Sequence, residues 1–277
     1  MKASILIPAH NEADYLPACL NALLASEDST SDIEVIVIAN GCTDNTVQIA
    51  QVFDASTRAR GWRLEVLDLV EGNKLTAWNA GESAANGDVL IYLDADVQVS
   101  SPLIGQIVGV LRTSDAAYAS GVPKVTTTGQ DSLIDLYTRF WTTTPFMVQG
   151  VPGFGIFAMN RAGRARWGAW PDIISDDTFA RLHFSPDERC AVQATYEWPM
   201  VEGFKKLVQV RRRQDIGVAE IVARFPELMG NDDPPHQIKP LWRRVCADPL
   251  AFLCFLMVRC AIRLPILRSD TRWVRGR

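Results

Sequence analysis

The sequence has no apolar run long enough for a membrane-spanning helix. Such a helix needs about 20 consecutive apolar residues, whereas the longest run, over residues 249–258, has ten. The first apolar stretch, residues 3–7, ends at Pro8 and is too short for the core of a secretory leader. We therefore expect neither a polytopic membrane protein nor a secreted one.

Cysteine and histidine are scarce. The chain has six cysteines without a CxxC pair and three histidines, which argues against a zinc site or a disulfide framework and favours a reducing compartment. Its 48% hydrophobic and 22% charged residues are typical of a folded globular protein and exclude global disorder. We therefore expect a cytoplasmic protein.

The charge is unevenly distributed along the 277 residues. The net charge is −4, but residues 239–277 carry nine basic and two acidic side chains, and the remaining residues have a net charge of −11. A basic segment of this kind favours contact with an anionic surface, either membrane or nucleic acid. Because the rest of the chain is acidic, we expect a membrane and no nucleic acid.

The first hundred residues alternate between strand and helix patterns. Apolar runs predict strands at residues 4–7, 33–39, 64–69 and 88–93. Between them, helices are expected over residues 16–24, from Thr43 or Asp44 past Ala50, and over 73–85. Such alternation predicts an α/β fold with a parallel sheet and right-handed crossovers.

The pattern is less regular after residue 100. The sequence predicts helices at 103–113 and 132–141, a strand at 116–122, a Gly/Pro-rich stretch at 150–160, and helical pieces near 176–184, 203–210 and 217–229. We divide the chain into residues 1–100, a nucleotide-binding half, and 101–229, the acceptor half of the same domain. Residues 230–240 are a linker by composition, and 241–277 a basic, apolar helical tail.

Two carboxylates, Asp94 and Asp96, stand at the end of the fourth predicted strand. In open α/β sheets, ligands bind outside the carboxyl ends of the strands. Two acidic side chains that meet there need a counter-charge, most simply Mg²⁺ or Mn²⁺. The alternative is an ordinary solvated turn.

Polar residues also follow the first two predicted strands. Asn40 has the amide donors and acceptor to read a base edge, and Glu12 or Asp44 is suited to accept from a base or ribose. The alternative is that these residues only form turns and helix caps. Lys74, at a helix start, is placed to reach a phosphate or the acidic pair, or is simply an exposed cation.

Four motifs, taken together, resemble a known family. IPAHNE, ANGCTDNT, GNKLTAWNAG and YLDADV, in this order and spacing, closely resemble the nucleotide-binding half of the inverting family 2 glycosyltransferases. The resemblance is strong over residues 3–100 and weaker at 150–155, 175–178 and 211–214. It implies a GT-A fold, a Rossmann-like, mainly parallel sheet flanked by helices, and a nucleotide-sugar donor.

The resemblance also implies roles for individual residues of the nucleotide site. Pro8, Ala9 and Glu12 correspond to the base-binding start of the family fold. Asn40 stands where the family has the second aspartate of an Asp-Asp-Gly-Ser run, so Ala39-Asn40 departs from the family pattern. Lys74 is assigned to the nucleotide site as well. We expect a UDP-sugar in preference to a GDP-sugar, although this departure leaves guanine open.

The carboxylates acquire roles in the same way. Asp96 corresponds to the main metal ligand of a DxD motif, and Asp94 to a residue shared between ribose and metal. Asp177 matches the general base, with Asp176 in place of the family's glutamate. Without the resemblance, Asp176 and Asp177 would be explained as the N-cap of a helix over residues 178–184.

The arginine run Arg211, Arg212 and Arg213 resembles the family's arginine-rich segment near the diphosphate and the acceptor phosphate. Three adjacent arginines cannot all point one way on a helix, so one or two of them are expected to touch a ligand. The alternative is a solvated helix face. The Gln-x-x-Arg-Trp motif of processive members is absent, because Gln214 is followed by Asp-Ile-Gly.

The tail allows three interpretations. As a helix, residues 249–258 would be about 15 Å long, half of a bilayer core. Because Arg259 and Arg263 share one face, the segment is predicted to be an interfacial helix that binds anionic lipid. The alternatives are a helix packed on the core, or a tilted span that would place both arginines in lipid.

Together these features predict a metal-dependent inverting glycosyltransferase, peripheral at the inner face of the cell membrane. It would add one sugar to a lipid-linked or glycan acceptor in cell-envelope or exopolysaccharide synthesis. One alternative is an aspartate-nucleophile phosphohydrolase, which also uses a DxD motif and a distal acid pair. Another is an inactive nucleotide-binding scaffold of the same fold.

Overall fold

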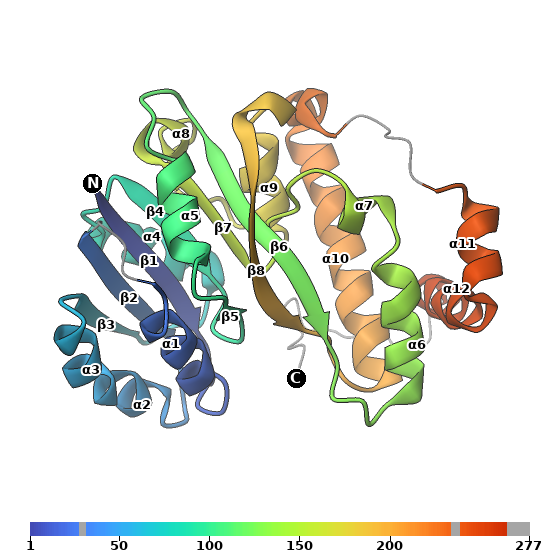
Figure 1. Ribbon diagram of the computed structural model, residues 1–277, viewed down its shortest axis with the longest axis horizontal. Coiled ribbons are helices and arrows are strands. Elements are labelled where there is room, and N and C mark those ends of the chain that lie inside the picture. The colour runs from blue at the N-terminus through green and yellow to red at the C-terminus, as the bar shows by residue number, and fades with distance from the viewer. Residues whose placement is uncertain (28–31, 234–238, 265–277) are drawn as a thin grey trace. The chain divides into compact units, whose positions relative to one another are not determined.

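The structure, a computed structural model, describes residues 1–27, 32–233 and 239–264 (Figure 1). The chain forms two compact units that interleave along the sequence. Unit 1 comprises Met1–Lys124, Gly153–Asp172 and His183–Trp198. Unit 2 comprises Val125–Pro152, Ile173–Leu182 and the chain from Pro199 onward.

Strands and helices alternate through most of the chain. The strands are β1 Lys2–Ala9, β2 Asp32–Asn40, β3 Arg63–Leu69, β4 Val89–Leu93, β5 Gln98–Val99, β6 Tyr118–Thr126, β7 Ile156–Asn160 and β8 Arg189–Pro199. The helices are α1 Leu16–Leu24, α2 Thr46–Val52, α3 Asp54–Ala59, α4 Lys74–Ala84, α5 Leu103–Val110, α6 Ser132–Trp141, α7 Pro145–Val148, α8 Arg161–Arg164, α9 Asp176–Leu182, α10 Phe204–Arg224, α11 Leu241–Ala247 and α12 Pro249–Arg263. Two short 3₁₀ helices are η1 Pro186–Glu188 and η2 Pro226–Asn231.

The strands form one mixed sheet in the order β3-β2-β1-β4-β7-β6-β8-β5. The four predicted strands of the first hundred residues pair in parallel, with Ala9 opposite Ala39 and Leu6 opposite Tyr92. Beyond β4 the sheet contains antiparallel pairs: β7 runs against both β4 and β6, and β5 runs against β8. The predicted α/β sheet flanked by helices is confirmed, and an antiparallel half extends it.

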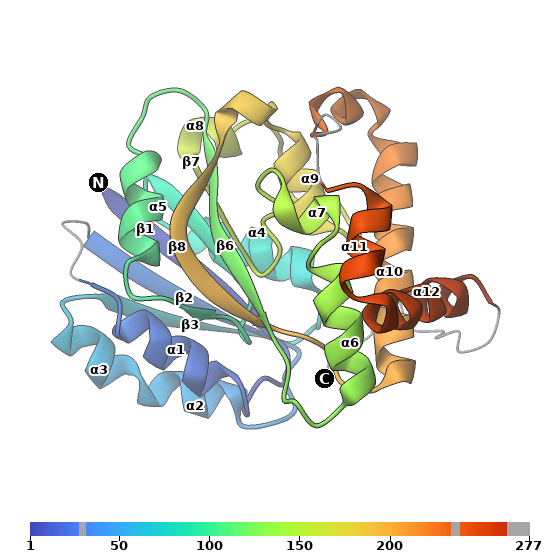
Figure 2. The same ribbon diagram turned by 45° about the vertical axis from the view of Figure 1, so that its right-hand side comes forward.

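Helices cover both faces of the parallel strands (Figure 1 and Figure 2). Alternate strand residues such as Ile5 and Val37 share a core with the apolar sides of α1 and α5. Helix α4 packs on the other face, so closely that a Cβ at Gly81 would lie 2.9 Å from Ile38 Cδ1. Burial on both faces explains why β1, β2 and β4 are almost continuous apolar runs.

Strands β7 and β8 were not expected from the sequence. Strand β7 lies within the Gly/Pro-rich stretch at 150–160, and its five residues are all buried. Gly153 and Gly155 precede it with φ of 72° and 78°, a backbone conformation that favours glycine. The glycines thus turn the chain into the middle of the sheet, a role that local composition does not distinguish from a loop.

A buried polar network ties α4 to the sheet. Glu82 accepts hydrogen bonds from Tyr92 Oη at 2.6 Å and Trp170 Nε1 at 2.5 Å. The Arg164 guanidinium also pairs with Glu82, and both side chains are about nine-tenths buried. Because burial penalises the phenolate and Glu82 is negative, the pKa of Tyr92 is raised. The network fixes the helix that begins at Lys74.

Unit 2 is mainly helical. Helix α10 is continuous over 21 residues, whereas the sequence predicted two separate pieces, so that prediction was wrong. The intervening polar residues include good helix formers, and the close packing of Gly217 offsets the low helix propensity of glycine. A Cβ at Gly217 would lie 2.3 Å from Ser175 Oγ, so this contact with the chain before α9 requires glycine.

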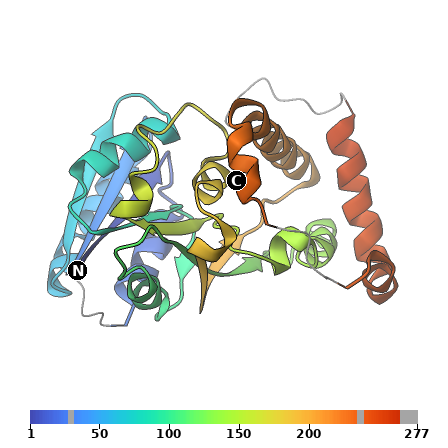
Figure 3. The same cartoon turned by 90° about the horizontal axis from the view of Figure 1, so that it is seen from above.

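Helix α12 has one packed side and one exposed side. Phe252 and Phe255 stack on α6, with ring centroids 5.1 Å from Phe140 and 5.7 Å from Tyr137, respectively. The other side exposes apolar residues, namely Leu250, Leu253, Leu256 and Met257. Figure 3 shows α12 as the red helix at the right-hand edge of the view. None of the described helices is long and apolar enough to span a membrane alone. Taken together, α11 and α12 have the length and composition of a span, but they are bent by 116° relative to each other.

We predict that Glu82→Gln lowers the free energy of unfolding by about 3 kcal/mol, because it leaves the buried Arg164 without a counter-charge. Urea titration followed by circular dichroism measures the change. The matched control is Glu65→Gln, whose partner Arg63 is 57% exposed and whose loss should cost less than about 1 kcal/mol. Equal losses in the two variants would show that the Glu82 network does not hold α4.

Candidate functional site

The loops after β1 and β2 are bound to each other in unit 1. Asn11 has φ of 54°, and its Oδ1 accepts hydrogen bonds from the backbone N–H groups of Thr43 at 2.6 Å and Asp44 at 3.3 Å. The backbone N–H of Glu12 donates to Thr46 Oγ1 at 2.8 Å. Because β1 and β2 are parallel, both loops lie at the carboxyl edge of the sheet, where ligands of α/β folds bind.

Three residues assigned to the nucleotide base are buried. Pro8 and Ala9 are the last residues of β1 and both are buried, Ala9 completely. Asn40 is 4% exposed, and its Nδ2 donates to the Ala9 carbonyl at 3.5 Å. Reading of a base by Asn40 stays a prediction and requires the amide to leave this contact. Glu12 is half-buried, just beyond the strand.

Asp94 and Asp96 follow β4 in a turn, in which the N–H of Val97 donates to the Asp94 carbonyl at 3.1 Å. The turn buries Ala95 and leaves both carboxylates half-buried. Lys74, the first residue of α4, places its Nζ 2.9 Å from Asp94 Oδ1. Lys74 thus reaches the acidic pair, one of the two partners expected of it.

The charges of the two carboxylates act on one buried thiol. Burial raises the pKa of Cys19, and the negative charges of Asp96 and Asp94 raise it further. Asp94 and Asp96 therefore both act on the interior at this edge of the sheet. No cluster of three or more acidic, histidine or cysteine ligands occurs among the residues that the structure describes. Two carboxylates fit a Mg²⁺ or Mn²⁺ ion whose remaining ligands are phosphate oxygens and water.

His10 is a residue of this edge that sequence reasoning left without a role. Its side chain is exposed, and its Nδ1 lies 2.6 Å from the Asn40 carbonyl. A carbonyl only accepts, so the Nδ1 of His10 carries a proton in this contact. The only indication in the sequence was its place directly after the first strand.

Asp176 and Asp177 form the first turn of α9 in unit 2. Asp176 is buried and Asp177 half-buried. Asp177 Oδ1 accepts a hydrogen bond from the Thr178 N–H at 2.6 Å. Both residues lie inside the helix, so the expected helix over 178–184 begins and ends two residues earlier, and the pair does not precede it as a cap.

Helix α9 is anchored at its other end. Phe179 packs edge-on against Phe225, with ring centroids 5.0 Å apart. Arg181 is 9% exposed and pairs with Asp233 at 2.7 Å and with Asp232 at 2.8 Å. These contacts attach α9 to the end of α10 and to η2, and so hold the turn that carries Asp177.

Two of the three arginines of the run serve the interior of unit 2. Arg211 is buried, with its guanidinium 3.9 Å from the centre of the Trp141 ring, and burial lowers its pKa. Arg212 donates to the carbonyls of Ala261 and Ile262 at the end of α12 and to that of Leu264, which follows the helix. The cations thus join α6, α10 and α12. The predicted ligand contact stays a prediction for Arg213, which is half-buried.

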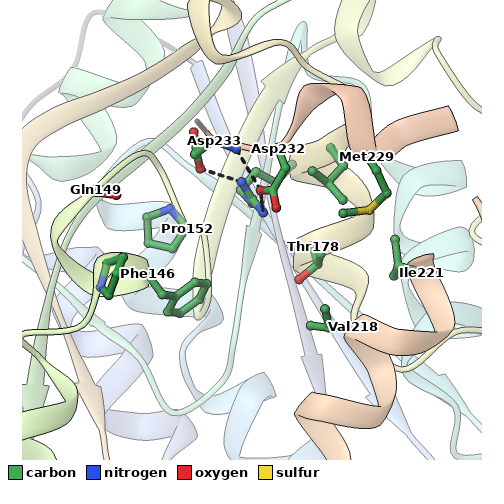
Figure 4. Close-up of a pocket in the computed structure, with 12 residues that line it drawn as sticks. Phe146, Gln149, Pro152, Thr178, Val218, Ile221, Met229, Asp232 and Asp233 are labelled. Atoms are coloured by element: carbon green, nitrogen blue, oxygen red, sulfur yellow. Dashed lines mark hydrogen bonds and ion pairs between the residues drawn. The ribbon is translucent and has the colours of Figure 1, made fainter. Parts of the chain in front are cut away.

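A cavity of about 460 Å³ lies within unit 2 (Figure 4). Thr178, which directly follows Asp177, is one of its lining residues. The others come from α7 and the chain after it, from α9, from α10, and from η2 with the two residues that follow it. This cavity was not expected from the sequence, because Asp232 and Asp233 belong to the stretch 230–240 that was interpreted as a linker.

Comparison with known proteins identifies the family. Residues 4–167 match the family model described as glycosyl transferase family 2. The glycosyltransferase AglE of Haloferax volcanii is 36% identical over 93 residues, which cover 34% of this chain and 30% of that protein. The chain spans about a third of the length of the curated relatives it matches first.

Two solved structures show the same GT-A type of fold. The mannosyltransferase PcManGT from Pyrobaculum calidifontis, in complex with GDP-Man and Mn²⁺, aligns over 95% of this chain and 76% of its own, with a TM-score of 0.62 and 17% identity. S. aureus TarS in complex with UDP-GlcNAc aligns over 80% of this chain and 67% of its own, with a TM-score of 0.53 and 17% identity. The family model covers more than half of the chain, and the chain therefore belongs to glycosyl transferase family 2.

Proposed function

We propose that the protein is an inverting glycosyltransferase that moves one sugar from a nucleoside diphosphate sugar to a hydroxyl-bearing acceptor. The observation that carries the proposal is the Asp94–Asp96 turn with Lys74 at 2.9 Å, at the carboxyl edge of a sheet whose sequence matches the family model. Unit 1 is assigned to the donor. Unit 2, with Asp177, is assigned to the acceptor.

The proposed reaction is a single displacement. The acceptor oxygen attacks the anomeric carbon, the bond between that carbon and the diphosphate oxygen breaks, and its electron pair leaves with the diphosphate. Asp177 takes the proton of the acceptor hydroxyl during the attack, for which it must be ionised and within about 3 Å of that oxygen. Attack from the face opposite the leaving group inverts the anomeric configuration.

Asp94 and Asp96 are assigned to a divalent cation together with the diphosphate. A bound Mg²⁺ or Mn²⁺ supplies charge stabilisation for the leaving diphosphate. Lys74 is positioned to add a cation at the same point, because its Nζ already contacts Asp94. The Mn²⁺ bound by the mannosyltransferase of similar fold supports a divalent cation here.

The base of the donor nucleotide is less closely defined than its diphosphate. We favour UDP over GDP, and the neighbours of similar fold include complexes with a UDP-sugar and with a GDP-sugar. For the acceptor we propose a lipid-linked compound or a glycan. A role in cell-envelope or exopolysaccharide synthesis and a place at the inner face of the cell membrane stay predictions.

The exposed side of α12 supports an anionic membrane as a further partner. Leu253 is 59% exposed and Leu250 58%, so this side of the helix offers apolar side chains to an interface. Exposed Lys239, Arg243 and Arg263 flank them. Apolar burial combined with basic flanks is the pattern of an interfacial helix.

We predict that Asp96→Asn abolishes Mn²⁺-dependent binding of the nucleoside diphosphate. Calorimetric titration of UDP and of GDP, each with and without Mn²⁺, measures it, and the wild type should bind one of them at least tenfold more tightly with the metal. Asp54→Asn, at a half-buried residue of α3 that pairs with Arg58, is the control and should bind like the wild type. Metal-dependent binding that persists in Asp96→Asn would contradict the assignment.

A second prediction concerns the base. Asp177→Asn should lower the rate of transfer by at least a factor of 100, which is the lower range of general-base contributions, and leave donor affinity within a few-fold. Release of nucleoside diphosphate in the presence of acceptor measures the rate. Asp187→Asn, at an exposed residue of η1, should leave the rate unchanged. Undiminished transfer in Asp177→Asn would show that another group takes the proton.

A third prediction concerns the exposed side of α12 as a membrane-binding surface. Leu253→Glu should weaken binding to vesicles that contain phosphatidylglycerol at least tenfold. Burying one leucine contributes about 1.5–3 kcal/mol, and the new carboxylate is repelled by the lipid. Co-sedimentation measures the bound fraction. The control Val52→Glu, at a residue of α2 that is 76% exposed, should bind like the wild type. Equal binding by the wild type and both variants would refute the proposal that the exposed side of α12 binds membranes.

A further inference from the structure

The cavity in unit 2 has an apolar wall that is open to solvent. Phe146 of α7 is 46% exposed and Val218 of α10 is 44% exposed, and both line the cavity. Ile221 and Met229 continue the wall beside Val218 (Figure 4). Exposed large apolar side chains that converge on a hollow favour a ligand, because they are covered only when something binds there.

Charged side chains lie at one end of the cavity. Asp232 and Asp233 line it together with Arg181, which pairs with both of them (Figure 4). Among the residues that the structure describes, two carboxylates face one guanidinium here, so these three side chains together have a formal charge of −1. A Cβ at Gly150 would lie 2.5 Å from Asp233 Oδ2, so the chain after α7 is packed against this carboxylate. Ion pairs and close backbone packing therefore hold the polar end of the cavity in place.

We propose that this cavity binds the acceptor as a neutral amphiphile with an apolar chain and a hydroxyl-bearing head, of the alkyl glycoside or neutral glycolipid class. The chain lies on Phe146, Val218 and Met229. The hydroxyl groups donate hydrogen bonds to the carboxylates of Asp232 and Asp233. A carboxylate accepts several hydrogen bonds, so the ion pair with Arg181 leaves it further acceptor capacity.

The charge of the polar end decides against an anionic head. A phosphate needs cationic or N–H donors, whereas the charge of Arg181 is already compensated by two carboxylates. Hydroxyl groups carry no charge and donate directly to carboxylates. The volume of about 460 Å³ is that of a small-molecule site.

The position of the cavity links it to the reaction. Thr178 lines it and directly follows Asp177 in the first turn of α9. The hydroxyl-bearing end of an acceptor held there would lie at Arg181, which follows Asp177 by one turn of the same helix. In this respect the inference rests on the proposed function, because it names the class of acceptor that unit 2 takes.

The test compares two glucosides that differ only in their chain. Octyl β-glucoside, below its micellar concentration, and methyl β-glucoside are titrated calorimetrically into the full-length protein. We expect the octyl compound to bind at least tenfold more tightly, because only its chain reaches the apolar wall. Equal affinity of the two compounds would overturn the proposal.

Two valines of α10 provide a matched pair of variants. Val218 lines the cavity and Val222 does not, and their exposed fractions are 44% and 45%. We expect Val218→Asn to lose the tenfold preference for the octyl compound and Val222→Asn to keep it. The same loss in both variants would place the chain elsewhere, for example on α12, and overturn the assignment.

The head group is tested with octyl phosphate. It should bind at least tenfold more weakly than octyl β-glucoside, and Asp232→Asn should narrow this difference by removing one negative charge while Asp233 still pairs with Arg181. Octyl phosphate binding as tightly as the glucoside would refute the neutral head.

Donor binding, measured on the same preparation, separates this inference from the proposed function. If no nucleoside diphosphate binds while the chain-length preference and its loss in Val218→Asn persist, the glycosyltransferase assignment fails and the cavity remains an amphiphile site. If a nucleoside diphosphate binds with Mn²⁺ and the two glucosides bind alike, the glycosyltransferase assignment stands and the cavity proposal fails.

Discussion

Parallel pairing of β1 with β2 and β4 is the constraint on which the proposed donor site depends. Each strand is buried on both faces, so its side chains are apolar and its polar chemistry must begin where the strand ends. Because the strands run in the same direction, these ends meet at one edge. Asn11, Asp44 and Asp94 therefore stand at the same edge although they are separated by up to 83 positions.

Helix α4 connects that edge to the interior. Its first residue, Lys74, contacts Asp94, and two turns later Glu82 is fixed by Tyr92, Trp170 and Arg164. The aromatic and ionic contacts of Glu82 compensate its buried charge and define the rotation of the helix. The position of the Lys74 ammonium is thus set by packing at the other end of the same helix.

Unit 2 uses its cations differently. Arg211 lies on the Trp141 ring and Arg212 binds the end of α12, so the arginine run mainly joins three helices. The arrangement leaves one side of α12 apolar and exposed, and it leaves a cavity beside α9 with an apolar wall and an acidic end. Both features are suited to amphiphilic partners.

The sequence by itself determined the strand–helix alternation of the first hundred residues, the family and the acidic turn after β4. These depend on local patterns, namely apolar runs, caps and short motifs. Only the tertiary structure decided the places of β7 and β8, the continuity of α10, the burial of Arg211 and Asn40, and the cavity with Asp232 and Asp233. Each of these depends on contacts between residues distant in sequence, such as Gly217 with Ser175 or Arg181 with Asp233, which no local pattern encodes.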